Sequence, residues 1–576
     1  MPRLRSSAGG AAALFLALGV VPLTAQAPPA GTDSVTIAAG PQYRAGRLHR
    51  LLLGAHWRAL WTAPVTVPVL DLETFDGGVT PVQRGGGLQT RSLRLRSASG
   101  REWTVRSVDK DPSTILPASL RETVLDRIVE DQTSAGHPFA ALVVPPLLDA
   151  AGVLHVEPQL VRMPEDAALG EFRDFAGMLG VIEERPDEGR DGEAGFAGAS
   201  EIVGTDKMLE RIEERAGHAV DAPAYLRARL MDLLLGDWDR HVDQWRWARH
   251  DSAGLTLWRP IPRDRDQAFA KYDGVLLWFA RQRAPQLVNF GPKYGPAIGL
   301  AWNARVLDRR LLTSLAWPSW EAEVADLQRR VDDGVIAAAT ASLPQGTPAG
   351  SAETLAATLR ARRDGLHTVA RALYDLLSGE VDVHLTDADE VVRVERLPDS
   401  TRVTVATADR TPTYLRTFLH RETDEIRLWL HGGDDRLDVQ GEGGPRLRVL
   451  GGGGRDSLLS EARETRLYDR GGQWRGPDGR EVAARDERWA PGDSAYPPRD
   501  WGGARFGVPV LAAGPDVGVV VGASLAWERY GFRQLPYAHR FDLRAAWAFG
   551  ANAGVVEARW DDRMEQSRAR VELLAR

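Results

Sequence analysis

The stretch 226–269 constrains the fold more than any other part of this 576-residue chain. It opens with leucines at positions i, i+4, i+7 and i+8, namely Leu226, Leu230, Leu233 and Leu234, a spacing that predicts one apolar helix stripe packed on a core. The predicted helix runs into GDWDRHVDQWRW, and the chain then returns as LTLWRPIPRDRDQAF. Two clusters of acidic side chains are therefore expected to meet where a buried helix ends.

The two acidic clusters carry the residue types that phosphoryl transfer needs. Asp239 and Gln244 are five residues apart, and a pair of aspartates, Asp264 and Asp266, follows about one hairpin later. This is the spacing of the acid, the amide and the metal-binding carboxylate in kinase catalytic loops. One carboxylate orients or deprotonates the attacking hydroxyl, and oxygen ligands hold Mg²⁺ against the phosphates. The alternative interpretation is a solvated helix end with tryptophans packed beneath it.

The segments DRHVDQ and DRDQAF resemble the catalytic core of the atypical kinases, with the HipA toxin kinases (DRHxxN) and the spore-coat CotH family (DxDxxF) as the nearest patterns. The resemblance implies that Asp239 is the catalytic residue. It further implies that either Asp264 or Asp266 is the principal metal ligand. Gln244 would assist, where the family has Asn. The implied cofactor is Mg²⁺ or Mn²⁺ with ATP or another nucleotide.

The part of the chain before this core is expected to form a smaller lobe that covers a nucleotide. A glycine-rich turn, Gly85, Gly86 and Gly87, enters an alternating strand, and glycines let backbone N–H groups approach phosphate oxygens closely. A plain hairpin turn is the alternative. Arg106 on the second strand and Lys110 just beyond it are both candidates for the cation that pairs with phosphates. Kinases use Lys on that strand, and the sequence does not choose between the two.

A helix over ASLRETVLDRIVEDQ follows, and in a kinase-like lobe its Glu122 is the natural ion-pair partner of that cation. A surface glutamate is the alternative. The apolar run MLGVIEERP then resembles the hinge that joins the lobes in the CotH family, so the resemblance covers residues 85–270. Amphipathic helices after the core would complete a helical large lobe.

Composition and charge exclude several classes of protein. The chain has no cysteine, which excludes thiolate zinc sites, iron–sulfur clusters and disulfide scaffolds. Its net charge of −7 argues against nucleic acid as the main partner. Residues 1–27 have the arginines, the apolar run and the small residues of a secretory signal, so the mature chain is expected to be exported.

Strand-type alternation replaces helical periodicity from position 381 to about 458, which predicts a β-rich module. Its near-repeat, RLWLHGGDDRLDVQG against RLRVLGGGGRDSLLS, resembles one degenerate turn of the glycine-and-aspartate β-roll of secreted bacterial proteins. The resemblance implies Ca²⁺ at Asp435, Asp438 or Asp456. Turn glycines between stacked strands are the alternative.

The last segments alternate in a different way. Phe541, Leu543, Ala545, Trp547 and Phe549 fall on one face of a predicted strand, which is the weak dyad signal of an outer-membrane β-barrel. Four such strands cannot close, since the smallest known barrels of this type have eight. We therefore expect a fragment of a longer protein; pairing with other chains and a soluble sandwich are the alternatives. The segment resembles the start of a surface-antigen-type barrel of Gram-negative bacteria.

The complete interpretation is an α+β protein with a two-lobed kinase-like domain, a β-rich module and a partial, truncated antiparallel outer-membrane β-barrel. The expected divisions are a signal peptide at 1–27, a small lobe at 28–185, a large helical lobe with the catalytic loop at 186–378, a β-rich connector at 379–470, and a linker with the incomplete barrel at 471–576.

The predicted function is Mg-dependent phosphoryl or nucleotidyl transfer to an unknown acceptor, by a periplasm-facing domain of a protein that contacts outer-membrane lipid. A difficulty is that the periplasm is not thought to maintain an ATP pool. The alternative is a non-catalytic kinase-like module for binding or assembly at the outer membrane, which the Arg and Gln departures from the kinase pattern favour. Metal-dependent hydrolysis is a third possibility, but no HExxH or GxSxG motif supports it.

Overall fold

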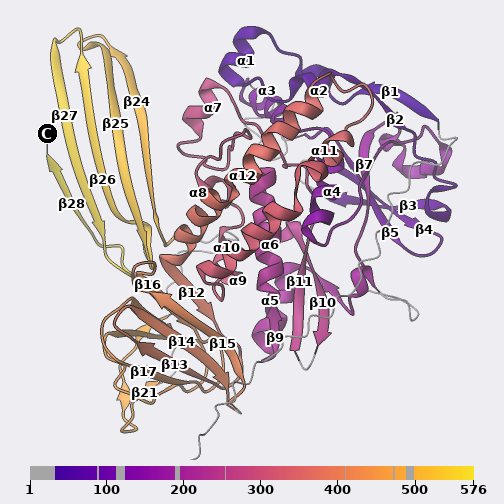
Figure 1. Cartoon of the computed structure of the whole chain (residues 1–576). Coiled ribbons are helices and arrows are strands. Elements are labelled where there is room, and N and C mark those ends of the chain that lie inside the picture. The colour runs from indigo at the N-terminus through magenta and orange to yellow at the C-terminus, as the bar shows by residue number, and fades with distance from the viewer. Residues whose placement is uncertain are drawn as a thin grey trace, which may run out of the picture.

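The computed structural model describes residues 33–86, 90–111, 124–187, 195–252, 255–408, 410–470, 474–487 and 499–575. These residues form a mixed α+β structure with several separate sheets and a strand-rich C-terminal region (Figure 1). The α+β class expected from the sequence is therefore confirmed. The predicted signal segment, Gly87 and Glu122 lie outside the described residues.

An antiparallel sheet in the order β3-β4-β5-β7-β6 dominates the first part of the chain. Leu93, Leu95, Val105 and Ile182 are completely buried on one of its faces, because apolar side chains alternate along each strand. The elements of this part are β1 (Ser34–Ala38), α1 (Arg47–Leu53), α2 (Arg58–Thr62), β2 (Pro64–Pro68), β3 (Val79–Gly86), β4 (Arg91–Ser97), β5 (Glu102–Ser107), α3 (Val124–Asp131), α4 (Ala140–Ala151), β6 (Gln159–Arg162) and β7 (Leu179–Glu184).

Helix α6 (Ala222–Leu235) is the centre of the largest core. Its N-terminus is capped by Asp221, whose side chain accepts a hydrogen bond from the backbone of Ala224 at 3.0 Å. It ends at Gly236, whose φ of +68° is the left-handed conformation that glycine adopts without strain. All four leucines of the predicted stripe are buried, as expected. The opposite side is buried too, since α4, α10, α12 and β11 surround the helix.

The chain returns from α6 as a hairpin. Strands β10 (Trp245–Ser252) and β11 (Leu255–Pro262) pair antiparallel, with Trp245 opposite Pro262, so the two acidic clusters flank one end of the hairpin. The hairpin belongs to a four-stranded sheet, β8-β10-β11-β9. The remaining elements of this part are α5 (Thr205–Glu214), α7 (Val275–Ala280), α8 (Ala297–Leu300), α9 (Arg305–Leu311), α10 (Trp317–Arg330), α11 (Asp333–Ala341), α12 (Ser351–Ser378), β8 (Ile202–Val203) and β9 (His218–Val220).

The β-rich module is a solenoid of two facing sheets whose stacked strands run parallel, and antiparallel pairs extend one of the sheets at both ends. Glu425 pairs with Arg446 in one sheet and Arg436 with Ser457 in the other, so both sheets advance by 21 residues per coil here. The near-repeat seen in the sequence is thus two successive coils. The strands are β12 (Glu380–His384), β13 (Glu390–Arg396), β14 (Ser400–Thr407), β15 (Pro412–Leu419), β16 (Glu425–Trp429), β17 (Arg436–Gln440), β18 (Arg446–Leu450), β19 (Ser457–Leu458), β20 (Thr465–Asp469), β21 (Trp474–Arg475), β22 (Glu481–Val482) and β23 (Arg485–Asp486).

A five-stranded antiparallel meander ends the described chain, consisting of β24 (Gly503–Gly514), β25 (Gly518–Gly531), β26 (Gln534–Ala548), β27 (Ala553–Arg563) and β28 (Arg570–Ala575). In Figure 1 it stands apart as a long curved sheet, drawn in yellow. Its register places Val521 opposite Trp547 and Leu525 opposite Leu543. The apolar positions of neighbouring strands therefore share one face, as the alternation predicts. Over the described residues, no helix is both long and apolar enough to span a membrane.

Candidate functional site

The two sequence motifs meet because the arginine of each one points inward and ties the loops together. Arg240 donates hydrogen bonds to the backbone carbonyls of Arg263 at 2.7 Å and Gln244 at 3.0 Å. Arg265 pairs with Asp232 of α6 and, at 3.0 Å, with Asp237. The two loops are thus fixed on the end of α6. The side chains of Asp239, Asp264 and Asp266, which flank these arginines in the sequence, take no part in these contacts.

These contacts belong to a neutral network of three arginines and three aspartates that is buried in the core of the domain. Arg229 connects Asp232 at 2.6 Å with Asp308 of α9 at 2.8 Å. Buried charges persist only when they are paired, since removing one partner leaves an uncompensated charge in a low dielectric. The members are Arg229, Arg240, Arg265, Asp232, Asp237 and Asp308. The network explains why polar residues lie in an otherwise apolar helix.

Asp264, Asp266 and Lys110 come together at the mouth of the loops. Lys110 lies just after β5 and forms an ion pair with Asp266. Asp264 has a φ of +53°, a left-handed conformation that is uncommon outside glycine and is often found at functional sites. Of the two expected phosphate cations, Lys110 is therefore the one in an ion pair with Asp266.

The environment separates the pKa values of the two aspartates. Burial and the negative charge of Asp264 raise the pKa of Asp266 to about 7. For Asp264, burial also opposes ionisation, but the positive charges of Arg106 and Lys110 prevail and lower its pKa to about 2. One carboxylate is thus ionised at neutral pH, while the other is poised near neutrality. Such a split is typical of sites with acid, base or metal chemistry.

Asp239 lies at the same opening, with its side chain partly exposed. Asn303, in the loop between α8 and α9, donates a hydrogen bond from Nδ2 to Asp239 Oδ1 at 2.6 Å. Arg240, the neighbour of Asp239, bonds to the backbone carbonyl of Arg263 beside Asp264. The negative charge of Asp239 contributes to raising the pKa of both Lys110 and Asp266. Sequence reasoning missed Asn303, because it carries no motif and lies more than sixty residues from Asp239.

In the described part of the chain, the other expected site residues form no hydrogen bond or ion pair with Asp239, Asp264 or Asp266. Gln244 closes a short 3-10 turn, Val242–Gln244, and its Nε2 lies 3.4 Å from His241 Nε2. Arg106 forms an ion pair with Glu183 of β7. Burial lowers the pKa of Arg106, but the carboxylates of Glu183 and Asp264 raise it above its ordinary value overall. Gly85 and Gly86 are the last two residues of β3, next to the turn that lies outside the described residues.

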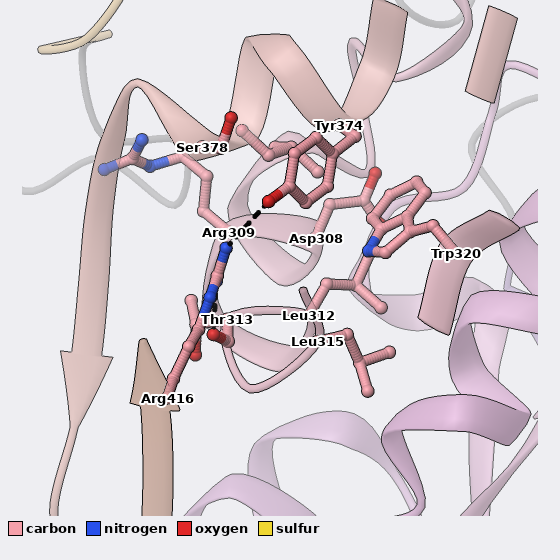
Figure 2. Close-up of a pocket in the computed structure, with 10 residues that line it drawn as sticks. Asp308, Arg309, Leu312, Thr313, Leu315, Trp320, Tyr374, Ser378 and Arg416 are labelled. Atoms are coloured by element: carbon pink, nitrogen blue, oxygen red, sulfur yellow. Dashed lines mark hydrogen bonds between the residues drawn. The ribbon is translucent and has the colours of Figure 1, made fainter. Parts of the chain in front are cut away.

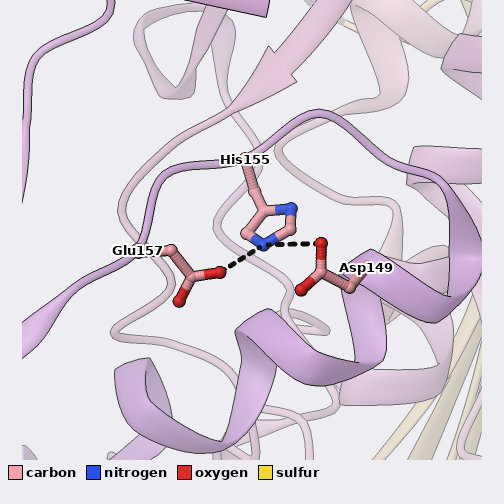
Figure 3. A group of neighbouring side chains, drawn as sticks. All are labelled: Asp149, His155 and Glu157. Carbon is pink, nitrogen blue, oxygen red and sulfur yellow. Dashed lines mark hydrogen bonds and ion pairs between the residues drawn. The ribbon is translucent and has the colours of Figure 1, made fainter. Parts of the chain in front are cut away.

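One compact group of metal-ligand type occurs among the described residues, and it is not the predicted one. The ligand atoms of Asp149, His155 and Glu157 all lie within 4.8 Å of one another (Figure 3). His155 Nε2 is 3.2 Å from Glu157 and 3.8 Å from Asp149, at the end of α4. His155 also lines a cavity of about 30 Å³ together with Glu183 and Asp264. Among the described residues, Asp239, Asp264 and Asp266 do not form a group this compact.

A second small cavity lies where the helices meet the solenoid (Figure 2). It has about 10 Å³ of free space, room for at most one water molecule. Arg416 of the solenoid enters it and donates to the backbone carbonyl of Thr313, while Arg309 bonds to the backbone of Glu380. The cavity is a packed joint between two parts of the chain rather than a substrate site.

The expected calcium ligands are divided between two places in the solenoid. Asp456 accepts a hydrogen bond from the backbone N–H of Asp435 at 3.2 Å, and Asp435 accepts one from Glu390 at 2.8 Å, so successive coils stack their carboxylates. Asp438 instead pairs with Arg393 at 3.4 Å. Burial raises the pKa of Asp435 to about 8 and that of Asp456 to about 7. Asp435 and Asp456 are thus buried carboxyl groups that accept hydrogen bonds from the backbone of the neighbouring coil.

Comparison with models of known protein families finds no match, and no relative is found among curated proteins.

Proposed function

We propose that this chain is an outer-membrane-associated protein whose first half is an atypical kinase-like phosphotransferase. The observation that carries the proposal is the convergence of three separate segments: Lys110 pairs with Asp266, and Arg240, next to Asp239, bonds to the backbone beside Asp264. A cation beside an acidic pair, with a further carboxylate at hand, is the equipment of a phosphoryl-transfer site. Lys110 follows β5 of the antiparallel sheet, whereas the acids lie in the loops that follow α6 and β11.

Each group has a distinct role in this proposal. Asp239, held by Asn303, orients or deprotonates the acceptor hydroxyl. Lys110 turns from Asp266 to the phosphates of the donor. The donor set would hold a divalent cation once Lys110 has moved away from Asp266: Asp264 is ionised at neutral pH, and Asp266, whose pKa is about 7, then ionises readily. Mg²⁺ or Mn²⁺ held by Asp264 or Asp266 would neutralise charge on the phosphates.

The test is stabilisation of the full chain, in mild detergent, by Mg²⁺ with ATP or another nucleotide. A ligand at 100 times its dissociation constant adds about 2.7 kcal/mol to the free energy of unfolding. Asp264→Asn combined with Asp266→Asn should abolish the stabilisation, whereas Asp239→Asn should keep it and lose phosphoryl transfer. The matched control is Asp243→Asn, whose carboxylate is 86% exposed in the same loop. Absence of stabilisation by every nucleotide would refute the proposal.

The second candidate function is a kinase-like module that binds or assembles without catalysis. It is favoured by the observation that both expected phosphate cations have protein partners, Lys110 with Asp266 and Arg106 with Glu183. In that case the ion pairs are structural. Lys110→Met would then lower stability with or without nucleotide, whereas in an enzyme it would lower nucleotide affinity most.

The proposed location rests on the C-terminal sheet. Its exposed apolar side chains include Leu511, Val521, Trp547, Val556 and Leu573. These residues share one face across the five strands, since Leu511 pairs with Val521 and Val521 with Trp547. A face of this size exposed to water is a site of aggregation, whereas it is stable against lipid.

Aromatic residues mark two levels on that apolar face. Trp527, Phe541 and Trp560 are neighbours across three strands, with ring centroids 5.6 Å and 6.2 Å apart. Trp547 lies six residues beyond Phe541 on β26, a distance of about 20 Å along an extended strand. Outer-membrane barrels have an apolar band about 25 Å tall between two aromatic girdles. The opposite face carries charged pairs, with Arg540 bound to Glu528 and Asp542 as expected of a wet lumen, beside the exposed Val508, Val555 and Leu574.

A further inference from the structure

A cluster of exposed apolar side chains lies on two short helices at the end of the molecule away from the solenoid. Helices α1 and α7 pack side by side, although 221 residues separate their last and first residues, Leu53 and Val275 (Figure 1). The exposed fractions reach 70% for Leu48, 61% for Leu51 and 55% for Trp278. The members of this cluster, called here the α1/α7 patch, are Leu48, Leu51, Leu52, Val275, Leu276, Trp278 and Phe279.

The two helices that carry the patch are firmly packed on each other. Helix α7 buries Leu277 and turns its other large side chains outward, and Gly274 packs directly on Gly54, where a Cβ would lie 2.6 Å from a backbone atom. The two helices are therefore docked on each other at a fixed place. A groove of about 450 Å³ lies between them, lined among others by Arg50, Leu51 and Trp278.

The charge around the patch is positive. Arg44, Arg47 and Arg50 precede or lie within α1 and are exposed to solvent. The carboxylate in the groove, Asp273, faces Lys271 at 3.8 Å and accepts a hydrogen bond from the backbone of His56. Leucines, a tryptophan and a phenylalanine beside arginines are the composition of helices that lie in a lipid–water interface.

We infer that the α1/α7 patch docks this domain on an anionic lipid surface, independently of phosphoryl transfer and of the C-terminal sheet. The apolar side chains enter the boundary between headgroups and acyl chains, where such a helix face sinks about 5–10 Å. The arginines contact the lipid phosphates. A lipid surface fits better than a protein partner, because exposed leucines next to long, exposed arginines complement apolar tails and negative headgroups, which form a fluid layer without a fixed shape.

The experiment is flotation of the full chain with vesicles of phosphatidylethanolamine and phosphatidylglycerol, compared with neutral phosphatidylcholine vesicles. A basic side chain near an anionic surface contributes about 1 kcal/mol, so Arg47→Gln with Arg50→Gln should weaken partitioning to anionic vesicles about 30-fold. Leu51→Ser with Trp278→Ser should weaken it on both vesicle types. Higher salt should reduce the difference between the vesicles.

Matched controls are chosen on the solenoid. Leu415 is 62% exposed there, and Leu415→Ser should leave partitioning unchanged. The double change Arg455→Gln and Arg480→Gln removes two exposed positive charges and should also have no effect on anionic vesicles. If the sheet alone binds lipid, patch variants and wild type float equally, and the inference is wrong. A second result would also contradict the inference. If the wild type sediments as a dimer without lipid, and Leu51→Ser makes it a monomer but leaves vesicle binding unchanged, the patch is an interface between two copies of the chain.

Discussion

Arg265→Met tests whether the arginine of the DRD motif is structural. The guanidinium of Arg265 pairs with Asp232 and, at 3.0 Å, with Asp237, and both carboxylates are completely buried. Without it, Asp232 keeps Arg229 at 2.6 Å, but Asp237 keeps only Arg240, at 3.6 Å. The neutral network acquires one uncompensated negative charge. Breaking a buried pair in this way costs about 3–5 kcal/mol of stability.

The charge argument makes a sharper prediction for the double variant. Asp237→Asn in the Arg265→Met background restores a neutral network, so it should recover about 1–3 kcal/mol of the loss, even though Asp237→Asn destabilises the wild type. The control is Arg329→Met on α10, which removes a 70% exposed arginine from a surface pair and should change stability by less than about 0.5 kcal/mol.

The assay is urea unfolding followed by tryptophan fluorescence. Trp245, Trp247 and Trp258 are buried in the same core as α6 and report on this domain. If Arg265→Met lowers the free energy of unfolding by less than about 1 kcal/mol, the idea that the buried network holds the two loops in place is refuted. So would a double variant no more stable than the single one, because the penalty would then come from lost packing rather than from charge.

Three further outcomes are expected. Burial raises the pKa of Asp435 to about 8, so its contribution to stability is complete near pH 4 and is lost as pH rises through 8. Asp435→Asn, which stays neutral, should therefore raise the unfolding temperature of the solenoid above pH 8. Burial lowers the pKa of His431 to about 4, so up to about 3 kcal/mol of stability is lost as pH falls from 6.5 towards 4. In thermal unfolding, His431→Asn should reduce this dependence of stability on pH. Ala545→Arg on the apolar face of β26 should cost about 2–4 kcal/mol in a bilayer, whereas the same change at the neighbouring Ala546, on the opposite face, should cost much less; equal costs in lipid-based unfolding would contradict a lipid-facing sheet.

Local periodicity determined much of the architecture. The leucine spacing of α6, the return of the chain as a hairpin and the alternation from Phe541 to Phe549 are properties of neighbouring residues, so they could be predicted without any tertiary contact. The same holds for the identity of Asp239, Asp264 and Asp266 as candidates, since residue type and spacing carry the chemical signal. The candidate acids could therefore be named from the sequence alone.

The tertiary structure decided which partners those acids have. Lys110 rather than Arg106 lies against Asp266, and Asn303 holds Asp239, because chain segments far apart in sequence are brought to one opening by the packing around α6. The register that stacks Asp435 on Asp456 is likewise set by the coil length of the solenoid. The exposure of the leucines of α1 was decided in the same way. The burial of an apolar run depends on which surfaces the rest of the chain has left to cover it.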